Sequence, residues 1–210
     1  MNILSDAEHE AVAKAIQAAE AHTDGEIYAV LARRSDDYFA AAGFAVSFAA
    51  IIAACLTALA LHYFWVQISV EDFALALAAA YLCALTILWL VPGARLWLVS
   101  RRTQYDRAHM NAQAQFLARN IHVTKHRTGI LIFVSLAERF AEVVADEAID
   151  LRVKQEEWDG IVATLIDHAK HGRLAGGYLI AIEQSGALLK HHFPKSHGDR
   201  NELDDHMVEL

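Results

Sequence analysis

Two long apolar stretches in the first half of the chain constrain its fold more than any other feature. They cover residues 40–66 and 73–91, and neither contains Lys, Arg, Asp or Glu. About 20 mostly apolar residues in a helix cross the hydrocarbon core of a bilayer, so the sequence predicts two spans joined by the short acidic link 67–72. The alternative is a hairpin buried in a soluble protein, but the rest of the 210-residue chain is too small to cover two helices that are apolar on every side.

Positive charge beside the stretches predicts their orientation, because Lys and Arg at the ends of membrane helices stay on the cytoplasmic side. Arg33 and Arg34 precede the first stretch and further arginines follow the second, whereas the link carries Glu71 and Asp72 and no basic residue. We therefore expect a multi-pass membrane protein with both termini in the cytoplasm. Residues 37–100 would form the hairpin, and residues 1–36 and 101–210 the two parts of one cytoplasmic domain, with Pro92 and Gly93 ending the second helix.

Composition excludes several classes of function. The net charge is -8, and the short run from Lys125 to Arg127 is too small a basic patch for nucleic acid. The cysteines, Cys55 and Cys83, both lie in the apolar stretches, where they behave as small hydrophobic residues. The acidic N-terminal segment has no apolar core of a signal peptide, so we expect no cleavable signal.

The segments outside the hairpin predict a single α/β domain. Ser5 and Glu8 have the spacing of a capping box, so a helix should begin near Asp6. Strands are expected at 26–32, 129–135 and 141–146, the last two as an antiparallel pair. A helix over 101–120 would make the first two strands the ends of a right-handed parallel crossover. Helices over 156–171 and 174–192 follow, and Met207, Val208 and Leu210 are expected to dock on the sheet. The predicted fold is a small mixed sheet flanked by helices, with a two-helix transmembrane hairpin inserted after the first strand.

The order of these segments resembles the TPM domain family, which includes thylakoid-lumen proteins of photosystem repair and bacterial membrane-tethered proteins. The matching stretches cover nearly all residues outside the hairpin: 4–8 with the helix that follows, 23–27, 127–146, 158–193, and a closing part at 192–194 and 201–205. The resemblance implies a sheet flanked by helices. Family members have been assigned phosphatase activity, bind calcium through acidic loops, or act in the assembly or repair of membrane complexes, and the association suggests a LemA-like membrane protein as partner.

The residues of the implied calcium site depart from the family pattern. Thr128 stands where soluble members have a carboxylate, and Asp146, Glu147 and Ala148 replace a glycine-rich turn. A hard cation needs several converging oxygen ligands. Three interpretations are open for the carboxylates of Asp146, Glu147 and Asp150. They form a small acidic patch at the end of a strand, they are solvated, or they cap the next helix.

Other side chains give weaker signals. Glu138 and Arg139, in the turn between two strands, are candidates for a partner contact or a surface ion pair. His168, His171 and the histidines at 191, 192, 197 and 206 lack the spacing of a zinc site. Small residues in the first span favour close approach of a second helix, which is either the second span of the same chain, another protein or a second copy.

Together the apolar stretches and the family resemblance predict a non-catalytic accessory module, anchored in the lipid bilayer of the bacterial inner membrane, that supports the assembly, repair or stability of a membrane protein complex. Candidate binding residues are Thr128, Glu138, Arg139, Asp146 and Glu147. The alternative, which the resemblance implies, is a metal-dependent phosphatase of low specificity with Asp146, Glu147 and Glu26 as metal ligands. Motifs of nucleophilic catalysis are absent from the sequence. A transporter is less consistent with spans that lack ionisable residues able to relay a proton.

Overall fold

The computed structural model describes residues 3–196 and 206–210. His197 and the segment 201–205, used above for the histidine pattern and the family resemblance, lie outside the described residues. The chain divides into two compact units. The first, Met1–Ser35 with Tyr105–Leu210, is called the sheet unit, and the second, Asp36–Gln104, the hairpin unit.

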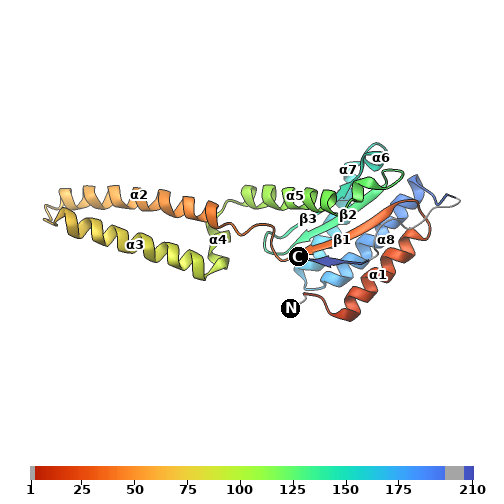
Figure 1. Cartoon of the computed structure of the whole chain (residues 1–210), viewed down its shortest axis with the longest axis horizontal. Helices are drawn as coiled ribbons and strands as arrows, with labels where there is room; N and C mark the ends of the chain where they lie inside the picture. Colours follow the sequence, from red (N-terminus) through yellow and green to blue (C-terminus); the bar gives the residue numbers. More distant parts are fainter. Residues whose placement is uncertain (1–2, 197–205) are drawn as a thin grey trace. The chain divides into compact units, whose positions relative to one another are not determined.

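A four-stranded mixed sheet of order β3-β2-β1-β4 forms the centre of the sheet unit (Figure 1). Glu26 of β1 lies opposite Gly129 of β2 in a parallel pair, and Ile130 of β2 lies opposite Ala145 of β3 in an antiparallel pair. Both pairings were predicted from the sequence and are confirmed. The strands are β1 (Glu26–Ala32), β2 (Gly129–Ser135), β3 (Phe140–Ala145) and β4 (Val208–Glu209).

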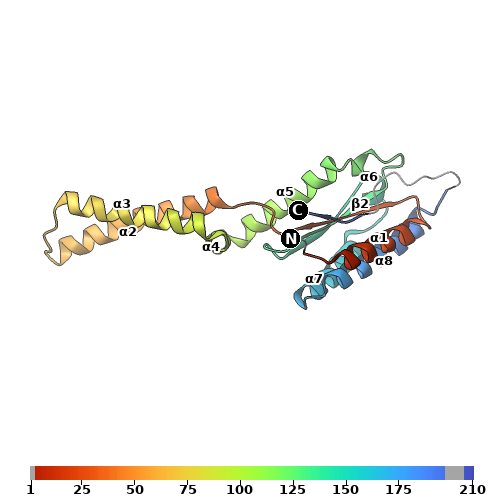
Figure 2. The ribbon, with the colours of Figure 1, turned by 60° about the horizontal axis from the view of Figure 1, so that its bottom comes forward.

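Helices cover both faces of the sheet (Figure 2). Three of them, α1 (Asp6–Glu20), α7 (Gln155–Lys170) and α8 (Leu174–His192), lie on one face, and α5 (Arg101–Ala118) lies on the other. β1 and β2 are buried along their whole length, as expected for central strands with helices on both sides. The short 3-10 helix η1 (Ile121–Val123) precedes β2, and the short helix α6 (Glu147–Asp150) follows β3.

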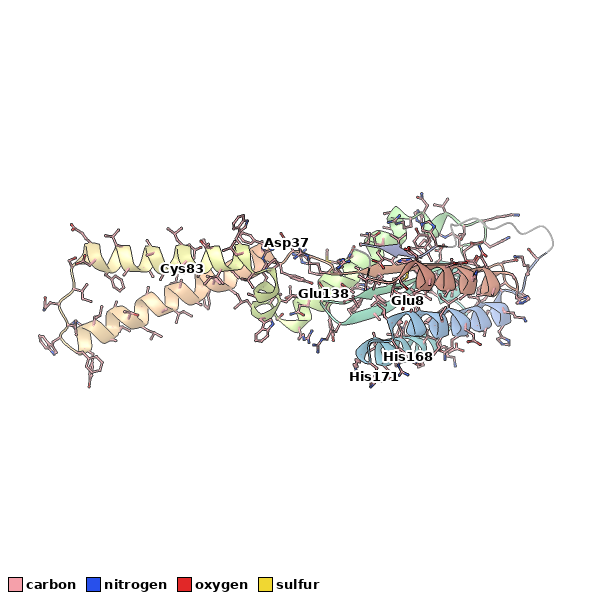
Figure 3. The ribbon with its side chains drawn as sticks, turned by 90° about the horizontal axis from the view of Figure 1, so that it is seen from below. Glu8, Asp37, Cys83, Glu138, His168 and His171 are labelled. Carbon is pink, nitrogen blue, oxygen red and sulfur yellow. The ribbon has the colours of Figure 1, made fainter. Side chains whose placement is uncertain are left out.

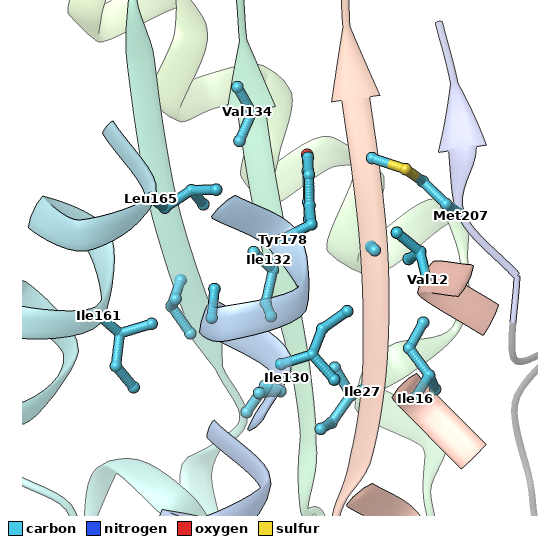
Figure 4. Close-up of a cluster of buried hydrophobic side chains, with 14 of the residues drawn as sticks. Val12, Ile16, Ile27, Ile130, Ile132, Val134, Ile161, Leu165, Tyr178 and Met207 are labelled. Atoms are coloured by element: carbon cyan, nitrogen blue, oxygen red, sulfur yellow. The ribbon is translucent and has the colours of Figure 1, made fainter. Parts of the chain in front are cut away.

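Alternate residues of the strands serve two separate cores, because successive side chains of a strand point to opposite faces. Figure 4 shows the larger core, on the side of α1, α7 and α8. Within it the Tyr178 hydroxyl donates a hydrogen bond of 2.7 Å to the carbonyl of Val30, and burial raises the pKa of this phenol. The larger core includes Ile16, Ile27, Leu31, Ile130, Ile132, Leu165 and Ile182, and the smaller one Tyr28, Val30, Ala112, Phe116, Ile121, Leu131 and Phe133.

The last described residues complete the sheet. Val208 lies opposite Val30 in a parallel pair, the amide of Leu210 donates to the carbonyl of Leu31, and Met207 is buried. The expected docking of this segment is therefore confirmed.

Glu209 ties β4 to the beginning of α1. Its carboxylate accepts hydrogen bonds from the amides of Ile3 at 2.6 Å and Leu4 at 2.8 Å, and lies 3.0 Å from the His9 ring nitrogen Nε2. Partial burial by itself would raise the pKa of Glu209, but these amides and the His9 ring together hold it below its usual range. The predicted capping box is also present, since the Glu8 amide bonds the Ser5 hydroxyl and the Glu8 carboxylate accepts from the Ser5 amide.

The hairpin unit contains α2 (Phe39–Tyr63), α3 (Val70–Leu90) and the short α4 (Pro92–Leu98). α2 and α3 are long and apolar enough to cross a membrane. The Ser47 hydroxyl joins them through a 2.8 Å hydrogen bond to the Tyr81 hydroxyl. α3 ends at Leu90, as expected from Pro92 and Gly93, and Pro92 occupies the start of α4, where a missing amide hydrogen costs nothing.

Arg95 of α4 is buried at the end of α3. Its Nε donates to the carbonyl of Leu88 at 2.8 Å and its Nη2 to the carbonyl of Trp89 at 3.1 Å. A helix leaves its last four carbonyls without intrahelical partners, so the guanidinium satisfies two groups that would otherwise lack a bond. Cys83 lies on α3, in the same unit (Figure 3), and both it and Cys55 are free thiols.

Candidate functional site

The candidate residues lie at opposite ends of the β2–β3 hairpin. Thr128 precedes β2 and Asp146 follows β3, so the antiparallel register brings them to one end of the sheet. Glu138 and Arg139 lie in the turn at the other end. The structure therefore separates the five predicted binding residues into two sites.

At the first end, Asp146 has a structural role. It is 2% exposed, and its Oδ1 accepts from the amide of Glu147 at 2.7 Å and from Arg127 Nε at 3.0 Å. It thereby caps α6, one of the roles considered from the sequence. Burial and then the neighbouring Asp146 raise the pKa of Asp150, on the same short helix.

Thr128 connects two loops at this end. It is 1% exposed, its hydroxyl donates to the carbonyl of Asp24 at 2.7 Å, and its amide donates to the hydroxyl of Thr124 at 3.1 Å. The Thr128 carbonyl in turn accepts from the amide of Glu26. Thr128 also borders a cleft of about 300 Å³ together with Asp24, His126, Ala148, Arg152, His192, Phe193 and Pro194.

The acids at this end do not fit a calcium ion. Glu147 is exposed and lies 3.6 Å from the same guanidinium that binds Asp146, so a cation already sits between the two carboxylates. A second, divalent cation there would be repelled by Arg127, and calcium takes six to eight oxygen ligands. Within residues 3–196 and 206–210, no three His, Cys, Asp or Glu side chains gather as a metal-ligand set.

His168 and His171 lie on α7 (Figure 3) and bond their own helix. Each Nδ1 lies within hydrogen-bond distance of the carbonyl four residues earlier, at 3.0 Å for His168 and 2.7 Å for His171. These rings therefore bond the helix backbone through Nδ1.

At the second end, Glu138 is fully buried, so the surface position considered for it is wrong. Its carboxylate accepts from the amide of Ser35 at 2.9 Å and from the hydroxyl of Ser135, and the two serine hydroxyls lie 2.9 Å apart. Ser135 is the last residue of β2 and pairs with Ala32, the last residue of β1. This parallel pairing explains why Glu138 is buried. It brings the segment after β1, which contains Ser35, beside the turn after β2, and the two segments enclose the Glu138 carboxylate.

Arg139, directly after Glu138, is exposed and has a left-handed backbone with φ of 53°. Its amide closes the turn by donating to the carbonyl of Leu136 at 3.1 Å. Left-handed backbone costs a non-glycine residue on the order of 1 kcal/mol. The turn holds an arginine at a position where glycine would fit better.

A cavity of about 420 Å³ opens beside this turn, and we call it the turn cavity. Arg139 and Lys170, the last residue of α7, are its two charged lining residues, and both are exposed. The sequence indicated Arg139 but not Lys170, because nothing in a linear pattern shows that the end of α7 lies beside the β2–β3 turn. The other lining residues are Val134, Ser135, Leu136, Phe140, Ala141, Leu165, Ile166 and Ala169.

No protein-family model and no curated protein matches the chain. Among solved structures, the NMR structure of the BA42 protein from the psychrophilic bacterium Bizionia argentinensis is similar to it, with a TM-score of 0.60 and 19% sequence identity. The match covers 100% of this chain and 97% of BA42. At this identity the likeness concerns the fold alone.

Proposed function

We propose that the chain is a TPM-like accessory protein, held at the cytoplasmic face of the bacterial inner membrane by α2 and α3, that supports assembly, repair or stability of a membrane protein complex. The observation that supports its membrane anchoring is the exposure of large apolar side chains along both helices, such as Phe44 at 75% and Trp89 at 67%. Exposed apolar surface costs about 25 cal/mol per Å² in water, and a bilayer removes that cost.

The TPM assignment rests on the order of elements in the sheet unit. A capped helix and a buried strand precede the hairpin unit, and α5, the β2–β3 hairpin, α7 and α8 follow it. This order agrees with the stretches that resemble the family, and the likeness to BA42 supports an α/β fold without bearing on activity.

A non-catalytic role is favoured by what the candidate residues do. Thr128, Asp146 and Glu138 are buried and hold loops or strand ends together, whereas Arg139 is exposed at the rim of the turn cavity. The surface beside Arg139 is therefore the better candidate for contact with a membrane complex, and a LemA-like protein is the proposed partner.

Two measurements test the proposal. Alkaline extraction of membranes should leave the full chain in the pellet, because only integral proteins resist it, and recovery in the supernatant would contradict membrane insertion. Affinity isolation from detergent-solubilised membranes should then recover a membrane protein with the wild type and with Lys154→Ala, and less of it with Arg139→Ala. If the wild type, Lys154→Ala and Arg139→Ala recover equal amounts of the membrane protein, Arg139 does not contribute to the contact with it.

One observation favours the alternative of a metal-dependent phosphatase. Asp146 Oδ2 is buried and has no hydrogen-bond partner among the described residues, so one carboxylate oxygen is not used by the fold. Asp146→Asn with Glu147→Gln keeps the α6 cap and removes both charges. If the purified wild-type chain hydrolyses an aryl phosphate and this double variant does not, the enzyme is supported; equal rates in both would exclude these ligands.

A further inference from the structure

We propose that the turn cavity binds an amphiphilic anion, with an acyl-like apolar body inside the cavity and a carboxylate or phosphate head between Arg139 and Lys170. The inference concerns the sheet unit alone, and it stands whether or not the accessory role is correct. The volume of about 420 Å³ falls in the range of small-molecule sites, which are mostly apolar with a few placed polar groups.

The cavity walls suit an apolar body. Val134 and Leu165 are buried beneath it, and Leu136 and Ile166 are half-buried at its sides. The neutral polar side chain of the lining, Ser135, already bonds Glu138 and Ser35. A ligand inside the cavity therefore meets chiefly hydrocarbon, so the walls contribute apolar contact and the selection of a head group must come from the charged rim.

The charge at the rim suits an anionic head. Arg139 and Lys170 are both exposed, and neither forms an ion pair within the part of the chain that the structure describes. Glu138, next to Arg139 in the chain, directs its carboxylate at Ser35 and Ser135 and is fully buried. The neighbouring acid thus does not neutralise the rim, and a guanidinium with an ammonium group recognises carboxylate or phosphate oxygens.

The backbone supplies an independent reason to assign a role to Arg139. A φ of 53° is disfavoured for a residue that has a Cβ, and residues with strained backbone are frequent at ligand sites. The Glu138 network fixes the turn in which this strain is held. Arg139→Gly should relieve the strain and remove the charge, so this variant should melt at a higher temperature than the wild type and bind the ligand less tightly.

The test uses the full chain in nanodiscs of phosphatidylcholine and the fluorescent probe dansyl-undecanoate, with empty nanodiscs subtracted. We expect saturable binding to the wild type, at least a tenfold weaker Kd in Arg139→Gln/Lys170→Gln, and loss of binding in Ala169→Phe, which fills the cavity. Lys154→Gln, an exposed charge just before the other end of α7, should bind within twofold of the wild type and serves as the matched control.

Competition then separates the head group from the source. Dodecanoate and dodecyl phosphate should displace the probe and neutral dodecanol should not. If phosphatidylglycerol in the nanodisc displaces the probe, the anion is a membrane lipid. If phosphatidylglycerol does not displace the probe, the anion is a free amphiphile. The proposal is overturned if no saturable binding occurs, if the double variant binds like the wild type, or if dodecanol competes as well as dodecanoate.

Discussion

At the scale of single residues, the buried carboxylate of Glu138 should dominate the stability of the turn. Glu138→Ala leaves the amide of Ser35 and the hydroxyl of Ser135 without their acceptor, and unsatisfied buried donors cost about 1–3 kcal/mol each. We expect the free energy of unfolding of the full chain to fall by about 2 kcal/mol or more in urea titration, and by less in Glu138→Gln, which keeps one oxygen acceptor.

Glu183→Ala is the matched control for this prediction, since Glu183 is exposed on α8 and should change stability by less than about 0.5 kcal/mol. If Glu138→Ala is as mild as Glu183→Ala, the serine network does not stabilise the fold.

The capping role of Asp146 was among the roles considered from the sequence, whereas the burial of Glu138 was not, and the difference has a physical reason. The capping role of Asp146 depends on the next residues in the chain, which a linear pattern contains. The burial of Glu138 depends on Ser35, about a hundred positions away, and on the parallel pairing that brings the two together. A glutamate in a turn is ordinarily exposed, so local reasoning predicted a surface position.

At the scale of elements, the contact of α1 with α8 depends on a glycine. A Cβ at position 186 would lie 2.6 Å from the Cβ of Ala19, well inside van der Waals distance. Gly186→Ala should therefore lower the stability of the sheet unit by about 1–2 kcal/mol, because overpacking forces the helices apart.

Gly176→Ala, on the same helix, is the control for the α1–α8 contact. The nearest atom to a Cβ there is 3.9 Å away, so alanine fits and raises helix propensity. The melting temperature of the full chain should fall for Gly186→Ala and rise for Gly176→Ala. A rise in both variants would mean that helix propensity outweighs the contact with Ala19.

A second prediction at this scale concerns the attachment of β4. Because the folded pKa of Glu209 is lowered, its charged form stabilises the fold fully above the ordinary carboxyl pKa of about 4.3 and loses this effect as the pH falls through the lowered value. The protection factors of the Ile3, Leu4 and Leu210 amides against hydrogen exchange should therefore fall on acidification below about pH 4.

Glu209→Gln should remove most of this pH dependence, since its neutral amide cannot titrate. If the protection factors of these amides fall with acid in the variant as they do in the wild type, another group controls the attachment of β4.

The longer elements could be predicted from sequence and the short ones could not. Hydrophobic runs and capping residues predicted β1, β2, α1 and α8 within a residue or two, and the helix between the strands predicted their parallel pairing. The short α4, η1 and α6 have too few residues for a periodic pattern. They form because Pro92 starts a helix, Asn120 adopts a left-handed backbone, and Asp146 caps α6.

At the scale of the whole molecule, the pairing of β1 with β2 restricts how the chain can meet a membrane. β1 ends at Ala32 and β2 begins at Gly129, and the two pair along seven residues although α2 and α3 lie between them in the chain. Strands of one sheet lie on one side of a bilayer, so the intervening chain can cross it only an even number of times. Two crossings by α2 and α3 satisfy this condition, whereas a single span does not.

The corresponding prediction concerns the accessibility of single cysteines in a chain with Cys55→Ser and Cys83→Ser. In intact cells with a permeabilised outer membrane, an impermeant maleimide should label Gln67→Cys, in the link between α2 and α3, and should label Lys14→Cys and Glu156→Cys only after lysis. All three positions are exposed in the structure, so burial does not limit the reaction. Labelling of Lys14→Cys and Glu156→Cys on opposite sides would contradict the shared sheet itself, whereas labelling of both from outside would invert the orientation predicted from Arg33 and Arg34 and leave the sheet intact.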